Sequence, residues 1–175
     1  MTLTPIRIDK LIQPHDCLEI LIQNGLMCNG IQLFQNDILV ITQKIVSKSE
    51  GRLVNLTEIN PSVEAKNLAL RTKKDARLVE LILRESREII RVHGSTIITE
   101  HKLGFVCANA GIDHSNVRGS WGKHEDWYLL LPENPDLSAL RIANNLKNIS
   151  GVKPGILIID SHGRAWRNGT IGTTI

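Results

Sequence analysis

Apolar residues recur along this chain at two spacings, and each spacing predicts its own kind of element. Helical spacing predicts four helices, over 16–24, from Pro61–Ser62 onward, from Asp75 through Ile90, and from Pro135 to about Lys147. Asp16, Asn60 and Asp75 suit the capping positions of the first three, and Gly25 is expected to end the first. The helix from Asp75 is expected to leave its Lys, Arg and Glu residues to solvent.

Short apolar runs predict the strands. The continuous runs 38–41 and 156–159 are typical of fully buried strands. Weaker signals predict strands over 5–8, 95–99, 105–108 and 129–131, and 118–127 is expected to be a flexible surface loop. Because helices and strands are mixed along the chain, we expect an α/β fold, or an α+β fold, with a mixed sheet and flanking helices.

The chain stops at Ile175, directly after the Gly- and Thr-rich segment GTIGTTI, which would normally lead into another strand. We therefore expect an architecture truncated at its C-terminus, in which strand 156–159 and tail 169–175 lack their usual neighbours. An unpaired apolar strand edge invites association with another chain. Low stability and self-association are the expected results.

Composition narrows the class of protein. With 175 residues, 42% hydrophobic and 22% charged, the chain fits one soluble globular domain over 1–175. The net charge is +3 and the basic residues are scattered, so no nucleic-acid partner is expected. No signal peptide opens the chain and no apolar run approaches the roughly 18 residues of a membrane span. We expect a cytoplasmic protein that does not enter a membrane.

Three cysteines, Cys17, Cys28 and Cys107, are odd in number and lack CxxC spacing. A disulfide framework and a zinc site are therefore not expected. Cys107 lies in an apolar run and is expected to be a small core residue.

Two segments with one pattern hold the strongest chemical signal. In GFVCANAGIDHSNV and in IIDSHGRAWRNG, a short apolar run is followed by an aspartate and then by small polar residues. Asp113 and Asp160 are thus expected at strand ends, where a hard divalent cation would take their oxygens. The alternative is that both cap turns. His114 and His162 follow them as candidate metal ligands or acid–base groups, or as ordinary surface residues.

Basic residues near strand ends are candidates for binding phosphate. Gln43, Lys44 and Lys48 follow the run 38–41, and the alternative for them is a solvated loop. Arg164 and Arg167 could clamp an anion or simply lie at the surface. The Ser161 hydroxyl suits a metal, a phosphate or a turn. Neither GxxxxGK[ST] nor GxGxxG is present, so a P-loop is excluded and a dinucleotide fold is disfavoured.

Taken together, the segments resemble the coenzyme F-420-0:L-glutamate ligase family, also called gamma-glutamyl ligase. The resemblance rests on DILVITQKIVSKSEGR, NPSVEAKNLA, DARLVELILRESREIIR, GFVCANAGIDHSNV, LLLPENPDLSALRI and IIDSHGRAWRNG, in this order along nearly the whole chain. It implies a ligase that joins L-glutamate to the lactyl carboxylate of a deazaflavin precursor, using GTP and a divalent metal (Mg²⁺ or Mn²⁺), as a homodimer.

The resemblance also implies site residues. Nucleotide contacts fall on Leu11, Ile12, Gln13, Pro14, Gln43, Lys44, Lys48 and Asn116, and metal contacts fall on Asp113, Asp160 and Ser161. Lys48 and Arg164 are the candidate catalytic groups, because phosphoryl transfer depends on positioning and charge stabilisation.

Three departures from the family pattern shape the expectations. Ser161 stands where the family usually has Thr, the loop 118–128 is longer, and the family's chain continues beyond the counterpart of Ile175. Three functions therefore compete: the ligase, a nucleotide- and metal-binding module without turnover, and a metal-dependent phosphohydrolase using Asp113 and Asp160. For the 175-residue chain alone, little or no ligation is expected.

Overall fold

The computed structural model describes residues 2–163 and 168–175, and these form a mixed α/β fold, as expected. They divide into two compact units. The first unit comprises Met1–Gly51 with Pro132–Thr174, and the second comprises Arg52–Leu131 with Ile175. Each unit has its own sheet structure, and the expectation of one domain over 1–175 stays a prediction.

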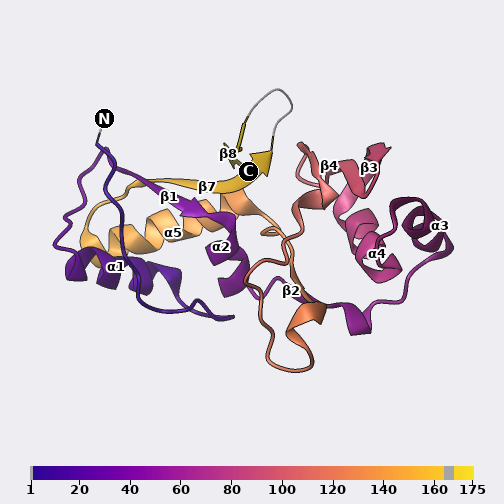
Figure 1. The fold of residues 1–175 in the computed structure, drawn as a ribbon. Helices are drawn as coiled ribbons and strands as arrows, with labels where there is room; N and C mark the ends of the chain where they lie inside the picture. The colour runs from indigo at the N-terminus through magenta and orange to yellow at the C-terminus, as the bar shows by residue number, and fades with distance from the viewer. Residues whose placement is uncertain (1, 164–167) are drawn as a thin grey trace. The chain divides into compact units, whose positions relative to one another are not determined.

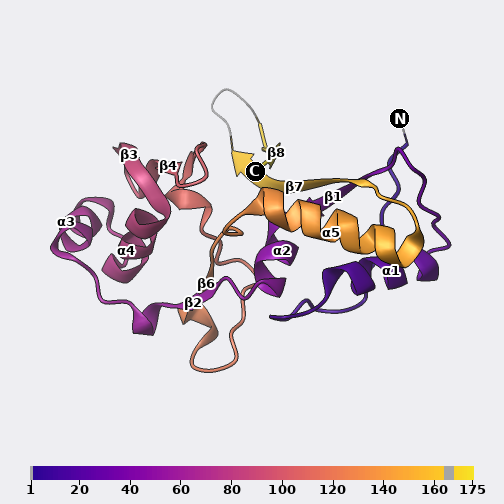
Figure 2. The same cartoon turned by 180° about the vertical axis from the view of Figure 1, so that it is seen from behind.

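The first unit is built on a mixed sheet of three strands in the order β1–β7–β8. Its elements are α1 (Leu18–Cys28), β1 (Ile38–Thr42), α2 (Gln43–Ser49), α5 (Pro135–Ser150), β7 (Gly155–Gly163) and β8 (Thr170–Thr174). β7 pairs parallel with β1 and antiparallel with β8. Figures 1 and 2 show α5 lying along β1 and β7, with α1 beside it. Strand 156–159 therefore pairs on both sides, whereas among the described residues the tail 169–175 pairs on one side only; the expectation that both lack further neighbours stays a prediction.

Burial in β1 alternates, and this corrects the prediction of a fully buried strand. Leu39 and Ile41 are buried, whereas Ile38 and Val40 are more than half exposed. Successive strand residues point to opposite faces, so only one face of this sheet contributes to the core of the unit. The continuous apolar run could not show this, because both faces carry apolar side chains.

Helix α1 begins and ends later than predicted. Cys17 is its N-cap, because the Asp16 carboxylate instead accepts hydrogen bonds from the Gln13 N–H and the Lys10 ammonium. Gly25 does not end the helix, which continues to Cys28. A side-chain carbon at Gly25 would lie 3.0 Å from Ile6 and 3.1 Å from Ile8. Glycine thus permits close approach of the segment 5–8, which is not the predicted strand.

The second unit contains two antiparallel sheets. One pairs β2 (Leu53–Asn55) with β6 (Trp127–Leu129), and the other has the order β3 (Ser86–His93), β4 (Thr96–His101), β5 (Val106–Ala108). Helices α3 (Val63–Thr72) and α4 (Ala76–Glu85) pack on each other, and α4 contacts β3. One core cluster joins residues of α3, α4, β4 and the turn Asn109–Gly111: Ala65, Leu68, Ala69, Val79, Ile82, Ile97 and Ala110.

Two predictions in this unit need correction. Ser62, rather than Asn60, caps α3, since its hydroxyl accepts the Ala65 N–H. Helix α4 is capped by Asp75 as predicted, but it ends at Glu85, and Ile89 and Ile90 belong to β3. The Ser86 hydroxyl donates to the Ile82 carbonyl at 2.6 Å where the backbone turns to extended geometry. Pairing with β4 then outweighs the helical spacing, in line with the strand preference of β-branched residues.

The segment 118–127 is fastened to the second unit by tryptophan contacts. Trp127 is 7% exposed and donates from its indole N–H to the Trp121 carbonyl at 2.7 Å. The two rings meet edge to face with centroids 5.3 Å apart. Gly119 lies against Trp127 so closely that any side-chain carbon would overlap the ring. The predicted surface loop therefore ends in a buried anchor.

Candidate functional site: strand ends and the loop of Asp113

The β1–α2 connection and the middle of β7 lie together at one end of the first unit's sheet. Thr42 ends β1 and pairs with Ile159, so α2 begins at Gln43 where β7 reaches Asp160. Ligands of α/β proteins usually bind beyond the carboxyl ends of parallel strands. The predicted residues Gln43 and Asp160 are thus brought to the same end of the sheet.

Gln43, Lys44 and Lys48 lie on a helix and not in a loop. Gln43 is 3% exposed and its side-chain carbonyl accepts a hydrogen bond from the Ser47 hydroxyl at 2.9 Å. Lys44 and Lys48 are half-buried and four residues apart, so they share a helix face. The fully buried Val46 anchors the same helix. Both lysines are therefore positioned by a packed element.

The predicted nucleotide segment 11–14 is tied to the far end of the same helix. The His15 N–H donates to the Ser49 carbonyl at 2.8 Å, with His15 in left-handed geometry at φ 67°. Asp16 closes the turn by accepting the Gln13 N–H, and the hydrogen bond from Lys10 lowers the pKa of this carboxyl. His15, which directly follows segment 11–14, is thus bonded to Ser49, the residue next to Lys48 in α2.

Asp160 and Ser161 are consecutive residues of β7, paired with Thr173 and Gly172 of β8. Neighbouring strand residues project to opposite faces, so the Asp160 carboxylate and the Ser161 hydroxyl leave the strand on different sides. The Asp160 side chain is 17% exposed, and its Oδ2 lies 2.9 Å from Nε2 of the buried His162. The roles of His162 as metal ligand or acid–base group stay predictions.

Asp113 belongs to the second unit and follows a left-handed turn. Asn109, Ala110 and Gly111 have φ of 51°, 53° and 64°. The side-chain oxygen Oδ1 of Asn109 accepts a hydrogen bond from the Ile97 N–H at 3.2 Å. At Gly111, a side-chain carbon would lie 2.8 Å from Leu131. Ala110 is 1% exposed, so a strained backbone conformation is held by packing.

The turn delivers Asp113 to a fixed position. Its backbone N–H and C=O both bond to Leu129, at 2.9 and 2.8 Å. Its carboxylate Oδ1 accepts from both the N–H and the hydroxyl of Ser115, at 2.7 and 2.8 Å. Asn116, the predicted nucleotide contact, is exposed with φ 56° in the same segment.

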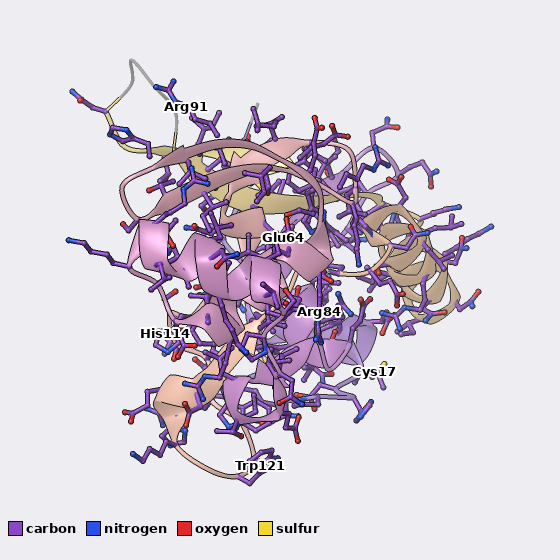
Figure 3. All side chains as sticks on the ribbon, turned by 90° about the vertical axis from the view of Figure 1, so that its right-hand side faces the viewer. Cys17, Glu64, Arg84, Arg91, His114 and Trp121 are labelled. Atoms are coloured by element: carbon purple, nitrogen blue, oxygen red, sulfur yellow. The ribbon has the colours of Figure 1, made fainter. Side chains whose placement is uncertain are left out.

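His114 is engaged by its neighbours. Its ring stacks on Tyr128 with centroids 4.6 Å apart, and its Nε2 lies 3.1 Å from the Glu125 carbonyl. The side chain is exposed on the surface of its unit (Figure 3). Burial raises the pKa of the Tyr128 hydroxyl beneath it. A role for His114 in metal binding stays a prediction.

The remaining candidates divide by what the structure describes. Arg164 and Arg167 lie outside the described residues.

Within 2–163 and 168–175, no three His, Cys, Asp or Glu side chains gather as a metal site. In the same residues, no helix has the length and apolarity of a membrane span. Cys107 is buried, as predicted. Sequence reasoning missed Asn109 as a residue that fixes the Asp113 loop, although Asn tolerates the left-handed geometry of turns.

Comparisons with known proteins show what this chain is similar to. The family model described as F420-0:Gamma-glutamyl ligase matches residues 6–175. Proteins named coenzyme F420:L-glutamate ligase are similar over most of the chain. The one from Methanopyrus kandleri is 41% identical over 175 residues, 100% of this chain and 65% of the relative. The one from Methanothermobacter thermautotrophicus is 44% identical over 165 residues, 94% and 63%. The one from Methanocaldococcus jannaschii is 42% identical over 139 residues, 79% and 53%.

The chain therefore belongs to the F420-0:gamma-glutamyl ligase family. It spans between 53% and 65% of the length of these three relatives.

Proposed function

We propose that this chain is, or is part of, a GTP- and metal-dependent ligase that adds L-glutamate to the deazaflavin precursor F420-0 through an amide bond. Support comes from the family match over 6–175 and from relatives about 40% identical whose name is coenzyme F420:L-glutamate ligase. The observation that carries most weight is the pairing of Thr42 with Ile159. This pairing brings α2, with its lysines, to the end of the sheet that holds Asp160.

The proposed nucleotide contacts are Leu11, Ile12, Gln13, Pro14, Gln43, Lys44, Lys48 and Asn116. The hydrogen bond from His15 to Ser49 supports grouping segment 11–14 with Lys48, because it ties the two parts of the first unit together. Gln43 is buried and its side chain accepts a hydrogen bond from Ser47 one turn further along α2. Lys48 is the proposed charge that stabilises the transferring phosphoryl group, and Arg164 is proposed for the same task.

The proposed metal ligands are Asp113, Asp160 and Ser161, which supply only oxygen atoms. Because the Asp160 and Ser161 side chains leave β7 on opposite faces, one ion would take the side chain of only one of these two. Carboxylate and hydroxyl oxygens suit Mg²⁺ or Mn²⁺, which keep several positions for water and substrate phosphate. Asp113 and Asp160 are also held by neighbours, Ser115 and His162 respectively. The bound cation would neutralise charge on the phosphates.

The chemistry needs an activated carboxylate, because a free carboxylate does not acylate an amine. An oxygen of the lactyl carboxylate would attack the γ-phosphorus of GTP, forming an acyl phosphate and releasing GDP. The glutamate amine would then attack the acyl carbon, forming the amide, releasing phosphate and losing a proton to water. Each amide bond would consume one GTP.

A second candidate is a nucleotide- and metal-binding module of the same family without turnover. The pairing that brings α2 and Asp160 to one end of the sheet would serve such a module equally well. The cytoplasmic location and the homodimer stay predictions in either case.

An assay of the purified chain with F420-0, L-glutamate, GTP and Mn²⁺ separates these functions. A glutamylated product formed with equal amounts of GDP and phosphate supports the ligase. Hydrolysis of GTP without amide formation, at saturating glutamate, would contradict the ligase and indicate a phosphohydrolase. Binding of GDP and Mn²⁺ without either reaction would support the binding module without turnover. Omitting each substrate in turn provides the matched controls.

A further inference from the structure

His101 is a buried ionisable residue that the proposed reaction does not use. It ends β4 and is 3% exposed, on the same strand face as the buried Ile97 and Thr99. Its ring stacks on Phe105, with centroids 5.3 Å apart and planes within 14°. The imidazole is therefore enclosed within the second unit.

The hydrogen bonds of the ring fix which nitrogen carries the proton. The Leu103 N–H donates to Nδ1 of His101 at 3.0 Å, so Nδ1 has to be unprotonated. The neutral ring then carries its proton on Nε2. Among the described residues Nε2 is buried without a hydrogen-bond partner. The native state thus requires the neutral ring.

The same residue closes the turn between β4 and β5. The His101 N–H donates to the Phe105 carbonyl at 2.8 Å, and the Gly104 N–H donates to the His101 carbonyl at 2.8 Å. With the bond from Leu103 to Nδ1, three hydrogen bonds hold the segment 101–105. The turn then passes directly into β5, which pairs with β4 through three residues.

The charged groups that face His101 do not favour a second positive charge there. Among the described residues, the carboxylate that acts on the ring is that of Glu85 in α4, which is paired with Arg52 at 3.0 Å and with Lys102 at 3.5 Å. Arg52, Arg87 of β3 and Lys102 of the turn are cations. Burial lowers the pKa of His101; Glu85 opposes this shift and the three cations add to it.

We propose that protonation of His101 opens the turn His101–Gly104 and releases β5 from β4, so that this residue acts as an acid-sensitive latch. A proton on Nδ1 would turn an acceptor into a donor facing the Leu103 N–H. The buried imidazolium would also face the positive charges of Arg52, Arg87 and Lys102, which are ion-paired with Glu85 or Glu100. Local opening removes both penalties by exposing the ring to water.

The latch has a consequence for the segment that follows. β5 leads through the left-handed turn of Asn109, Ala110 and Gly111 to Asp113. Acid would therefore loosen the loop that carries Asp113 and Asn116. This consequence rests on the proposed function, whereas the opening of the turn does not.

Amide hydrogen exchange measured by NMR between pH 7 and pH 5 tests the opening directly. Protection factors, corrected for the intrinsic pH dependence of exchange, should fall on acidification for Leu103 and for the amides of β5. The fall should be about tenfold for each unit by which the pKa of His101 in the open turn exceeds its pKa in the closed turn. Amides paired between β3 and β4 should keep their protection. His101→Asn keeps an acceptor near the position of Nδ1 but cannot be protonated, so its turn should stay closed.

His93→Asn is the matched control, since His93 is an exposed histidine of β3 in the same unit. It should respond to acid as the wild type does. The proposal is overturned if His101→Asn loses protection of β5 as the wild type does. It is also overturned if the acid opening in the wild type does not follow the titration of the His101 ring, which its side-chain NMR signals report even if the variant fails to fold.

Discussion

Thr42 pairs with Ile159 in the parallel ladder of β1 and β7, and this pairing sets where the predicted site residues of the first unit lie. The residue after Thr42 begins α2, and the residue after Ile159 is Asp160. A shift of the ladder by one position would turn Asp160 to the other face of the sheet. The register therefore matters more to the site than any single contact within it.

Replacing Lys48 by Ala should weaken GDP binding without affecting folding. A charge-assisted contact to phosphate contributes about 1.5 to 3 kcal/mol, so the loss should be of that size. The free energy of unfolding should change by under about 0.5 kcal/mol, as for an ordinary half-exposed position. Calorimetric titration of GDP and urea unfolding measure the two quantities.

Lys153→Ala, at an exposed position of the same unit, is the control and should leave GDP affinity unchanged. Unchanged affinity in Lys48→Ala together with a lowered melting temperature would mean that Lys48 is a structural residue.

Gly119→Ala should destabilise the second unit. The added methyl group would overlap the Trp127 ring, which is held by the Trp121 carbonyl and cannot move freely. Overpacking of this kind costs about 1 to 3 kcal/mol. Tryptophan fluorescence during urea unfolding reports the change, and Ser120→Ala at the exposed neighbouring position should be nearly neutral. Equal stability of both variants would show that Trp127 is not anchored as described.

Asp75 should make the stability of α4 depend on pH in the acid range. The hydrogen bond from Arg77 lowers the pKa of Asp75, and the carboxylate also caps the helix through the Arg77 N–H. A lowered folded-state pKa stabilises the protein above the unfolded value of about 3.9, and the contribution disappears as pH falls through the folded value. Asp75→Asn should keep the cap and lose this pH dependence.

At neutral pH, Asp75→Ala should cost about 0.5 to 2 kcal/mol through loss of the N-cap. Urea unfolding at a series of pH values checks both variants. An unchanged acid profile in Asp75→Asn would assign the pH dependence to other carboxylates.

The sequence predicted the helices and strands best where local signals agreed with packing. Asp75 and Pro135 mark helix starts in both the sequence and the structure, and Gly151 caps α5 with φ 77°. The prediction was wrong at Ile89 and Ile90, where helical spacing continues but pairing with β4 forms a strand. Such pairing involves residues distant in sequence, so periodicity alone could not reveal it.

Candidate residues for the site can be named from the sequence, but their local geometry cannot. Lys44 and Lys48 were identified as phosphate candidates in a loop, and the structure has them on a packed helix. Gly25 predicts a helix stop because glycine often ends helices, yet in the structure it allows the close approach of Ile6 and Ile8. The contact between His162 and Asp160 follows from their i, i+2 spacing only once β7 is known to extend through Gly163.

Titration of GDP in the presence and absence of Mn²⁺ tests the central claim most directly, that nucleotide phosphate and a metal ion meet at the strand ends. Wild type should bind GDP at least about tenfold more tightly with Mn²⁺, equivalent to about 1.4 kcal/mol of coupling. Asp160→Asn and Asp113→Asn should lose this gain, while Asp136→Asn, at an exposed position of α5, should keep it. Equal GDP affinity with and without Mn²⁺ in the wild type, or a full gain in Asp160→Asn, would contradict the account.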